Sequence, residues 1–371
     1  MILGILKEPS FEKRVSLLPE SLAALIKKNV QVWIEPNAGL YAFSPDDEYS
    51  KLGGQIKSRD EIIQNANLIL SMHGDDLPGS LKSKTIIGVY QPLFQPQLMR
   101  EWAGKMMTVF SLDMLPRTTR AQSMDVLSSQ ANIAGYKAVL AAANMLPRYF
   151  PMFITAAGSI PPAKVLILGA GVAGLQAIAT ARRLGAVVEV FDTRPQVKEE
   201  VLSLGGKFIE VEGAADASSA GGYAVEQSEG FQQRQKEKIA ESIAKADIVI
   251  TTAQIPGKRA PVLVSKDMVE SMKLGSVIID LAASTGGNTE LTENNKTITH
   301  EGVAIYGDSS LAASMPVDAS KLYGKNVLNF LQLLIDKDGN LILPFEDELV
   351  KGSCITHNGE IVNERVRQLV P

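Results

Sequence analysis

The sequence holds few of the residues that metal and thiol chemistry require. Its 371 residues include one cysteine, Cys354, and three histidines. A single cysteine excludes an intramolecular disulfide and a cysteine-rich metal site, and it indicates a reducing compartment. The histidines, at positions 73, 300 and 357, are too scattered to form a recognisable metal-binding motif. We therefore expect no resident metal in this chain.

Two further features are missing, an excess of one charge and a long hydrophobic run. The chain has 37 basic and 41 acidic side chains, a net charge of −4, which argues against nucleic acid as the main partner. Lys7 and Glu8 come too early to leave room for the apolar segment of a signal peptide. The longest uncharged run, residues 165–181, contains three glycines and is shorter than the roughly 20 apolar residues of a spanning helix. We expect a soluble chain with no membrane span.

What the chain does have is an alternation of short apolar runs, rich in β-branched residues, with stretches of helical periodicity. This pattern is typical of parallel sheets covered by helices on both faces. The fold class that we expect is α/β, with two Rossmann-like doubly wound parallel-sheet domains. Strands of the first domain are expected at residues 2–6, 30–34, 68–72, 85–89 and 107–111, and strands of the second at residues 164–168, 187–191, 207–211, 247–252, 276–281 and 303–306.

Two helical segments connect these domains. Residues 122–145 are rich in alanine and long enough to bridge the domains, and residues 317–335 predict an amphipathic helix that returns the chain to the first one. We therefore expect a discontinuous first domain, residues 1–125 plus 317–371, and a second domain of residues 126–316. Residues 212–230 are small, polar and glycine-rich, and a loop of this length inside a compact domain is usually functional or disordered.

The stretch KVLILGAGVAGLQAIATARRLGAVVEVFD predicts a dinucleotide site in the second domain. An apolar strand leads into a glycine-rich turn, a helix follows, and a second strand ends at Asp192. In such a turn the first glycine permits a tight bend, the second lets the backbone approach a pyrophosphate, and the third allows close helix–strand packing. A glycine-rich turn that binds nothing is the alternative, which the ordered context disfavours. The residues of the turn are Gly169, Ala170, Gly171, Val172, Ala173 and Gly174.

The acid at the end of the second strand bears on the choice of nucleotide. Asp192 favours NAD over NADP, because a carboxylate accepts hydrogen bonds from ribose hydroxyls and repels a 2′-phosphate. Arg194 weakens this inference, since an arginine nearby can accommodate that phosphate. A surface ion pair is an equally good interpretation of Arg194 from the sequence. No second glycine motif occurs, so one chain is expected to bind one dinucleotide, and its hydride partner is a small molecule or lies on another chain.

The segment LPRTTRAQSMDVLSSQ also holds polar groups at helical spacing. If a helix begins near Thr119, then Gln122, Asp125 and Ser128 share one face and could hold a carboxamide. The same residues have a structural interpretation, because Thr119 and Gln122 fit a capping box and Asp125 suits the start of a helix. Spacing alone favours the structural interpretation.

Several motifs together resemble one family over essentially the whole chain. They are RTTRAQSMDVLSSQANIAGYKAV, GAGVAG, FDTRP, AGGYA, TTAQIPGKRAPVL, SVIIDLAASTGGN and KNVLNFL, and they are similar to the NAD(H)-binding subunit of proton-translocating nicotinamide nucleotide transhydrogenase. The resemblance implies that hydride passes directly from NAD(H) on this chain to NADP(H) on a partner subunit. Such transfer requires no general acid or base here, and the protein's task is to position the two nicotinamides.

The resemblance also implies roles for particular residues. Arg117, Asp125 and Ser128 are expected to hold the nicotinamide carboxamide and its ribose, and Gln122 to reach towards the NADP(H) side. Further cofactor contacts are expected from a loop that closes over the nucleotide and from three other segments. These residues are Gly222 and Tyr223 in the loop, Thr193 and Arg194 beside Asp192, Gln235, and Gln254.

Two other functions remain open at this stage. Alanine dehydrogenase resembles the same family, and Arg14 occupies a position where those enzymes use an arginine on substrate, although the expected lysine near His73 is absent. A module that senses NAD without catalysis is the third interpretation. In the favoured interpretation the partners are the NADP(H)-binding and membrane subunits of a transhydrogenase. The chain is then expected to be a homodimer in the cytoplasm, peripheral to the bacterial inner membrane.

Overall fold

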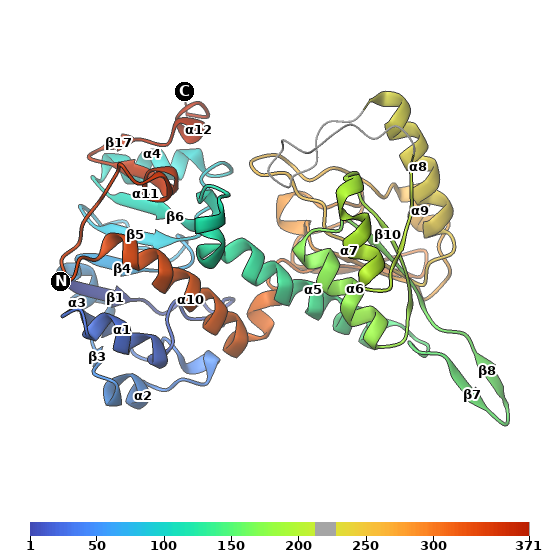
Figure 1. Ribbon diagram of the computed structural model, residues 1–371, viewed down its shortest axis with the longest axis horizontal. Helices are drawn as coiled ribbons and strands as arrows, with labels where there is room; N and C mark the ends of the chain where they lie inside the picture. The colour runs from blue at the N-terminus through green and yellow to red at the C-terminus, as the bar shows by residue number, and fades with distance from the viewer. Residues whose placement is uncertain (212–227, 371) are drawn as a thin grey trace. The chain divides into compact units, whose positions relative to one another are not determined.

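The computed structural model describes residues 1–211 and 228–370, which form two compact units (Figure 1). Unit 1 consists of Met1–Gln130 and Ala312–Pro371, and unit 2 of Ala131–Leu311. The domain boundaries expected after residues 125 and 316 stay a prediction about which segments fold independently.

Unit 1 is built on an eight-stranded sheet in the order β17-β16-β6-β5-β4-β1-β2-β3. Strands β1 to β6 pair in parallel, and the late strands β16 and β17 add an antiparallel edge. Strands β16 and β17, from the end of the chain, therefore lie beside β6 from its first half. The strands are β1 (Ile2–Ile5), β2 (Gln31–Ile34), β3 (Gln55–Ile56), β4 (Leu68–Leu70), β5 (Thr85–Gly88), β6 (Thr108–Ser111), β16 (Cys354–His357) and β17 (Glu360–Ile361).

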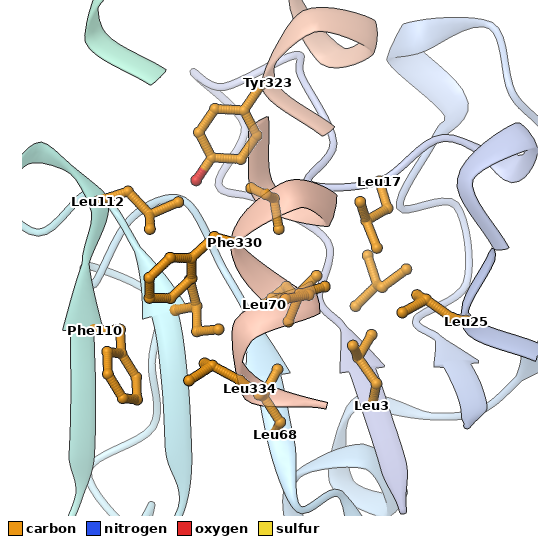
Figure 2. Close-up of a cluster of buried hydrophobic side chains, with 14 of the residues drawn as sticks. Leu3, Leu17, Leu25, Leu68, Leu70, Phe110, Leu112, Tyr323, Phe330 and Leu334 are labelled. Carbon is orange, nitrogen blue, oxygen red and sulfur yellow. The ribbon is translucent and has the colours of Figure 1, made fainter. Parts of the chain in front are cut away.

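Helix α10 (Pro316–Leu334) covers one face of this sheet. Phe330 and Leu334 project from it onto inward side chains of the strands, among them Leu68 and Phe110 (Figure 2). The Phe110 and Phe330 rings meet edge-on with centroids 5.6 Å apart, a favoured aromatic geometry. The opposite face packs on α3 (Arg59–Asn65) and α4 (Pro96–Gly104). The sheet is thus buried on both faces, as its continuous apolar strands require. The remaining helices of unit 1 are α1 (Leu22–Ile26), α2 (Asp46–Lys51), α11 (Glu348–Ser353) and α12 (Glu364–Arg367).

Unit 2 contains a seven-stranded sheet in the order β11-β10-β9-β12-β13-β15-β14, parallel except for the edge strand β14. Its strands are β9 (Lys164–Leu168), β10 (Val187–Phe191), β11 (Lys207–Phe208), β12 (Ile248–Thr251), β13 (Val277–Asp280), β14 (Lys296–His300) and β15 (Val303–Gly307). One face packs on α6 (Val172–Arg183), α7 (Lys198–Ser203) and the second half of α5 (Val126–Met145). The other face packs on α8 (Glu229–Ile243) and α9 (Lys266–Glu270).

The fold class expected from the sequence is confirmed, and a strand of the structure lies within or across each expected range. The sequence did not predict the antiparallel strands β14, β16 and β17, the short parallel strand β3 or the small hairpin of β7 (Phe153–Thr155) and β8 (Gly158–Ile160). None of these strands has the continuous apolar run that marks a buried parallel strand in the sequence. Across the described residues, no helix combines the length and the apolar character that crossing a membrane requires.

Candidate functional site

The glycine-rich turn at residues 169–174 connects β9 to α6. Gly169 has a φ of +108°, a left-handed conformation that a side chain would strain. A Cβ atom there would lie 2.4 Å from Oγ1 of Thr252, and this hydroxyl donates a hydrogen bond to the Gly169 carbonyl at 3.1 Å. Glycine at this position therefore makes the bend and admits the neighbouring loop.

The other two glycines of the turn serve opposite purposes. A Cβ on Gly174 would lie 1.9 Å from the Gly169 carbonyl oxygen, so only glycine lets α6 pack this closely on the end of β9. A Cβ on Gly171 would meet nothing within 4 Å. Gly171 is also the N-cap of α6, and no side chain among the described residues caps that end. The backbone around Gly171 is therefore open to an anion, which a helix N-terminus favours.

Helix α5 supports the turn through a further close approach. A Cβ on Gly135 would lie 2.1 Å from the Ala173 carbonyl oxygen, so α5 contacts the first turn of α6 through backbone atoms. The sequence analysis did not single out Gly135, because a lone glycine in an alanine-rich helix carries no distinctive pattern. Its effect is to hold the start of α6 in place.

The turn lies at the topological switch point of the unit 2 sheet. From β9 the chain moves to β10 on one side and later returns to β12 on the other. In open α/β sheets, ligands bind outside the carboxyl ends of the strands at such a point. Gln254 follows β12 at this edge, where its side chain is exposed and Nε2 donates to the Leu281 carbonyl at 2.9 Å. The structure thus brings Gln254 to the same edge as the glycine turn.

A buried polar network fixes the loops at this edge, and the sequence did not reveal it. Asp280 ends β13 and is fully buried; its carboxylate accepts hydrogen bonds from backbone amides of Ala282 and Asn288 and from the Thr292 hydroxyl. The Asn288 amide bonds both the N–H and the carbonyl of Ala253. The only available signal was an acid at a strand end, which identifies no partner.

Asp192 lies at the end of β10, where the sequence placed it. Its Oδ1 accepts from the backbone N–H and Nε of Arg194 at 2.8 and 2.9 Å, and its Oδ2 accepts from Ala170 N and Arg194 Nη2 at 2.7 and 2.8 Å. The hydrogen bond to Asp192 raises the pKa of the Arg194 guanidinium. The ion pair of Asp192 and Arg194 is present but is largely buried and not at the surface, and a contact of Arg194 with the cofactor stays a prediction.

The remaining cofactor residues predicted in unit 2 fall into two groups. Thr193 is half-buried beside Asp192, and Gln235 is half-buried in the second turn of α8, four residues after the core residue Phe231. Gly222 and Tyr223 lie outside the residues that the structure describes. The sites expected at these positions stay predictions.

The polar segment of unit 1 differs from the predicted helix. Thr119–Met124 forms a 3-10 helix, η4, and α5 begins only at Val126. The expectation of one helix from Thr119, with Gln122, Asp125 and Ser128 on one face, is therefore wrong. No capping box forms at Thr119 either, because η4 is preceded by Thr118, whose side chain makes no cap hydrogen bond in the described structure.

Asp125 and Ser128 are brought together instead by the start of α5. Asp125 Oδ1 accepts from Ser128 N at 2.9 Å, and Oδ2 accepts from the Ser128 hydroxyl at 2.6 Å. The carboxylate thus caps the helix and fixes the serine. Because the Ser128 hydroxyl proton is committed to Asp125, the free capacity of Ser128 Oγ is as an acceptor.

Arg117 and Gln122 are exposed. Helix α10 holds η4 through two asparagine side chains. Asn326 and Asn329 each donate from Nδ2 to the Ser123 carbonyl at 2.8 Å. This double amide contact fixes the backbone next to Gln122 and leaves that side chain directed to solvent. The sequence analysis did not identify these asparagines, since nothing in a helix sequence shows which distant carbonyl its amides will meet.

A buried ionic cluster lies at the switch point of the unit 1 sheet, between the loops that follow β1 and β4. Arg14 donates from Nε and Nη2 to the Glu12 carboxylate at 2.8 and 2.6 Å and from Nη1 to Gln130 at 2.8 Å. His73 Nε2 lies 2.8 Å from the same carboxylate. Burial disfavours the charge on Glu12, but the hydrogen bonds from Arg14 and His73 outweigh it and hold the pKa of that carboxyl far below its usual value. Burial raises the pKa of neighbouring Glu8 to about 7.

This cluster leaves Arg14 committed to groups of its own chain. Three of its nitrogens are engaged by Glu12 and Gln130, so a substrate carboxylate would have to displace one of them.

Nowhere in the described structure do three or more histidine, cysteine, aspartate or glutamate side chains form a metal-binding group.

Comparison with known proteins places the chain in a family. A family model described as alanine dehydrogenase/PNT, N-terminal domain, matches residues 4–134, and one described as the C-terminal domain of the same family matches residues 138–364. In Rickettsia prowazekii, the first part of NAD(P) transhydrogenase subunit alpha is 43% identical over 99% of this chain and 97% of that protein. Alanine dehydrogenase of Staphylococcus epidermidis is 27% identical over 99% of this chain and 96% of its own length.

A solved structure supports the same assignment. The crystal structure of transhydrogenase from Sinorhizobium meliloti superposes with a TM-score of 0.87 and 44% sequence identity, covering 97% of this chain and 100% of that one. The resemblance first noted in the sequence motifs is therefore confirmed. With two family matches that together span nearly its whole length, the chain belongs to the alanine dehydrogenase/PNT family.

Proposed function

We propose that this chain is the NAD(H)-binding subunit of a proton-translocating transhydrogenase. Hydride passes directly between NAD(H) on this chain and NADP(H) on a partner subunit, and the transfer is coupled to proton movement across a membrane. The observation that carries the proposal is the glycine turn at residues 169–174, with its open backbone at Gly171 and uncapped helix end. Similarity to a transhydrogenase subunit over nearly the full length of both proteins supports it.

The residues of unit 2 fit a dinucleotide. The N–H groups at the start of α6 and the space beside Gly171 suit a pyrophosphate. Asp192, Thr193 and Arg194, which follow β10, are proposed to contact the adenosine ribose, as the acid at this strand end does in this fold. Gln254, at the same edge, and Gln235 on α8 are proposed as further pocket residues, and Gly222 and Tyr223 as part of a loop that closes over the nucleotide.

The residues of unit 1 suit the nicotinamide end. With its proton held by Asp125, Ser128 Oγ can accept a hydrogen bond from the amino group of a carboxamide. Arg117 is a donor and complements the carboxamide oxygen or the ribose. The three side chains thus offer the donor and the acceptor that a carboxamide requires.

The chemistry asked of this chain is positioning. When bound, the nicotinamide ring supplies the hydride. The chain's own residues then orient that ring and exclude water, and none acts as a general acid or base. Gln122 lies exposed on η4, a segment held by Asn326 and Asn329, and we assign it the role of meeting the NADP(H)-bearing partner.

Partner subunits follow from the same proposal. The Rickettsia relative is named as the first part of a subunit alpha, which implies further parts, and the described residues contain no spanning helix. We propose that separate chains carry the NADP(H) site and the membrane passage. This chain, as a homodimer, docks on the cytoplasmic face of the bacterial inner membrane.

Alanine dehydrogenase receives less support as the function. Its identity to this chain is 27%, against 43% for the transhydrogenase subunit. Arg14, the residue that would hold a substrate carboxylate, is already engaged by Glu12 and Gln130. A module that only senses NAD would leave the Asp125–Ser128 pair and the fixed Gln122 segment without a use.

One pair of mixtures separates these functions. The purified chain is given NADH with pyruvate and ammonia, and separately NADH with an NADP-loaded transhydrogenase NADP-binding subunit. We expect NADPH formation in the second mixture and no alanine in the first. Alanine formation would establish the dehydrogenase, and tight NADH binding without product in either mixture would indicate a sensor.

Gly171→Ala tests the pyrophosphate site. The new Cβ meets open space and the φ of −77° suits alanine, so thermal stability should stay within about 0.5 kcal/mol of wild type. The dissociation constant of NADH should nevertheless rise at least about tenfold, because the methyl group occupies the space required by the pyrophosphate. Titration calorimetry measures this dissociation constant. Gly104→Ala, another glycine facing open space, is the matched control and should change neither quantity. Unchanged NADH affinity in Gly171→Ala would place the pyrophosphate elsewhere.

Gln122→Asn tests the role assigned to the η4 segment. Shortening the side chain by one methylene should slow hydride transfer to the NADP-loaded partner about tenfold or more, since transfer depends on close alignment of two nicotinamides. NADH affinity should stay within about twofold because the residue is assigned to the partner side. Arg120→Lys, on the same segment, serves as the control. An intact transfer rate combined with weakened NADH binding would contradict this role.

A further inference from the structure

Gln130, in the second turn of α5, is held by two other segments of unit 1. Its Oε1 accepts a hydrogen bond from Arg14 Nη1 at 2.8 Å, and its Nε2 donates to the Ala319 carbonyl of α10 at 3.1 Å and to the Ser129 hydroxyl at 3.2 Å. The loop after β1 and helix α10 thus meet at one side-chain amide. Because these residues all belong to unit 1, the contacts fix the start of α5 within that unit.

Arg14 is itself immobilised, so it can act as a support. Its backbone N–H, Nε and Nη2 all donate to the Glu12 carboxylate, at 2.6 to 2.9 Å, and His73 Nε2 lies 2.8 Å from the same carboxylate. The Arg14 and Glu12 side chains are 14% and 2% exposed. The planar guanidinium therefore joins a fixed, buried acid to the amide of Gln130.

Such a pair contributes more to position than to stability. The cost of removing two charges from water offsets most of their attraction, so a buried ion pair adds little net stability. Its hydrogen bonds are directional, however, and a guanidinium fixes the relative orientation of the groups that it joins. Arg14 is therefore suited to hold Gln130 at a defined place.

The place of Gln130 matters because Ser128 lies two residues earlier on the same helix. Asp125 accepts hydrogen bonds from the Ser128 hydroxyl at 2.6 Å and from the Ser128 N–H at 2.9 Å, but this local cap moves with the helix that it begins. Residues two apart lie on different faces of a helix, so Arg14 contacts α5 away from the Ser128 side chain. The helix backbone is what connects the two.

We propose that Arg14 is a positioning residue of the nicotinamide site. It holds Gln130 and thereby, through the backbone of α5, fixes the Ser128 hydroxyl that receives the carboxamide. The arginine that resemblance to alanine dehydrogenase suggested as a substrate ligand then supports the cofactor site instead. The inference rests on the proposed function, to which it adds a residue of the buried ionic cluster.

Two variants of the full chain break this contact in different ways. Arg14→Lys keeps a positive charge beside Glu12 but lacks the planar fork that also reaches Gln130. Gln130→Met keeps the length of the side chain, removes its amide and leaves the Arg14–Glu12 pair in place. Hydride transfer from NADH to the NADP-loaded partner subunit is measured for each. Calorimetry measures the binding of NADH and of ADP-ribose, which lacks the nicotinamide ring, and circular dichroism checks each fold.

We expect each single variant to transfer hydride at least about tenfold more slowly than wild type, because the ring is less well aligned. NADH should bind about threefold or more weakly, while the affinity for ADP-ribose stays within about twofold. The double variant Arg14→Lys/Gln130→Met should transfer hydride within about twofold of the slower single variant, since both changes break one contact.

Arg148→Lys is the matched control. Arg148 joins the buried Asp247 to the Pro161 carbonyl in unit 2, with hydrogen bonds of 3.1 and 3.0 Å, as Arg14 joins Glu12 to Gln130 in unit 1. Asp247 lies at the amino end of β12, at the sheet edge opposite to the glycine turn. The control should change neither the transfer rate nor the affinity for NADH or ADP-ribose.

The other possible results overturn the positioning role. A wild-type transfer rate in folded Gln130→Met does so even where that variant is less stable. Equal losses of NADH and ADP-ribose affinity would indicate a general distortion, and rate losses that multiply in the double variant would show that Arg14 does not act through Gln130. If Arg14→Lys does not fold, Gln130→Met decides alone. A wild-type chain that transfers no hydride contradicts the proposed function instead, so the two failures are distinguishable.

Discussion

The close approach of α6 to the end of β9 is the constraint on which the nucleotide site proposed in unit 2 depends. A Cβ on Gly174 would overlap the Gly169 carbonyl, and one on Gly135 would overlap the carbonyl of Ala173. Backbone-to-backbone packing on two sides therefore fixes the first turn of α6. The anion site that we propose at Gly171 requires this turn to be fixed. The polar network of Asp280 and Asn288 holds the neighbouring loops at the same edge.

Polar groups of unit 1 are fixed in a comparable way, although by side chains. Asp125 binds Ser128 through both its backbone and its hydroxyl, and two asparagines of α10 hold the carbonyl of Ser123. Arg14 joins Glu12 to Gln130 in the second turn of α5. In the proposed function these side chains align a ring for hydride transfer, which requires rigid supports. These hydrogen bonds supply that rigidity.

The sequence predicted well those features whose causes are local. Strands β9 and β10 match the predicted ranges, and Asp192 lies at the predicted strand end. The start of α5 was misplaced because η4 and an α-helix share similar side-chain preferences, and the break depends on the Asp125 cap and on contacts from α10. The pairing of Asp280 with Asn288 could not be predicted, and neither could the burial of the Asp192–Arg194 ion pair, which the sequence offered only as a surface pair. Both depend on where folding places donors around a carboxylate.

The central claim is that hydride moves directly from NADH on this chain to NADP⁺ on a partner. The most direct measurement follows the label from NADH that carries deuterium at both C4 positions, mixed with this chain and an NADP⁺-loaded partner subunit in ordinary water. Mass spectrometry of the NADPH product should find one deuterium in every molecule formed, because the transferred hydride never meets solvent. NADPH that carries solvent hydrogen at C4, or no NADPH at all, would contradict the account.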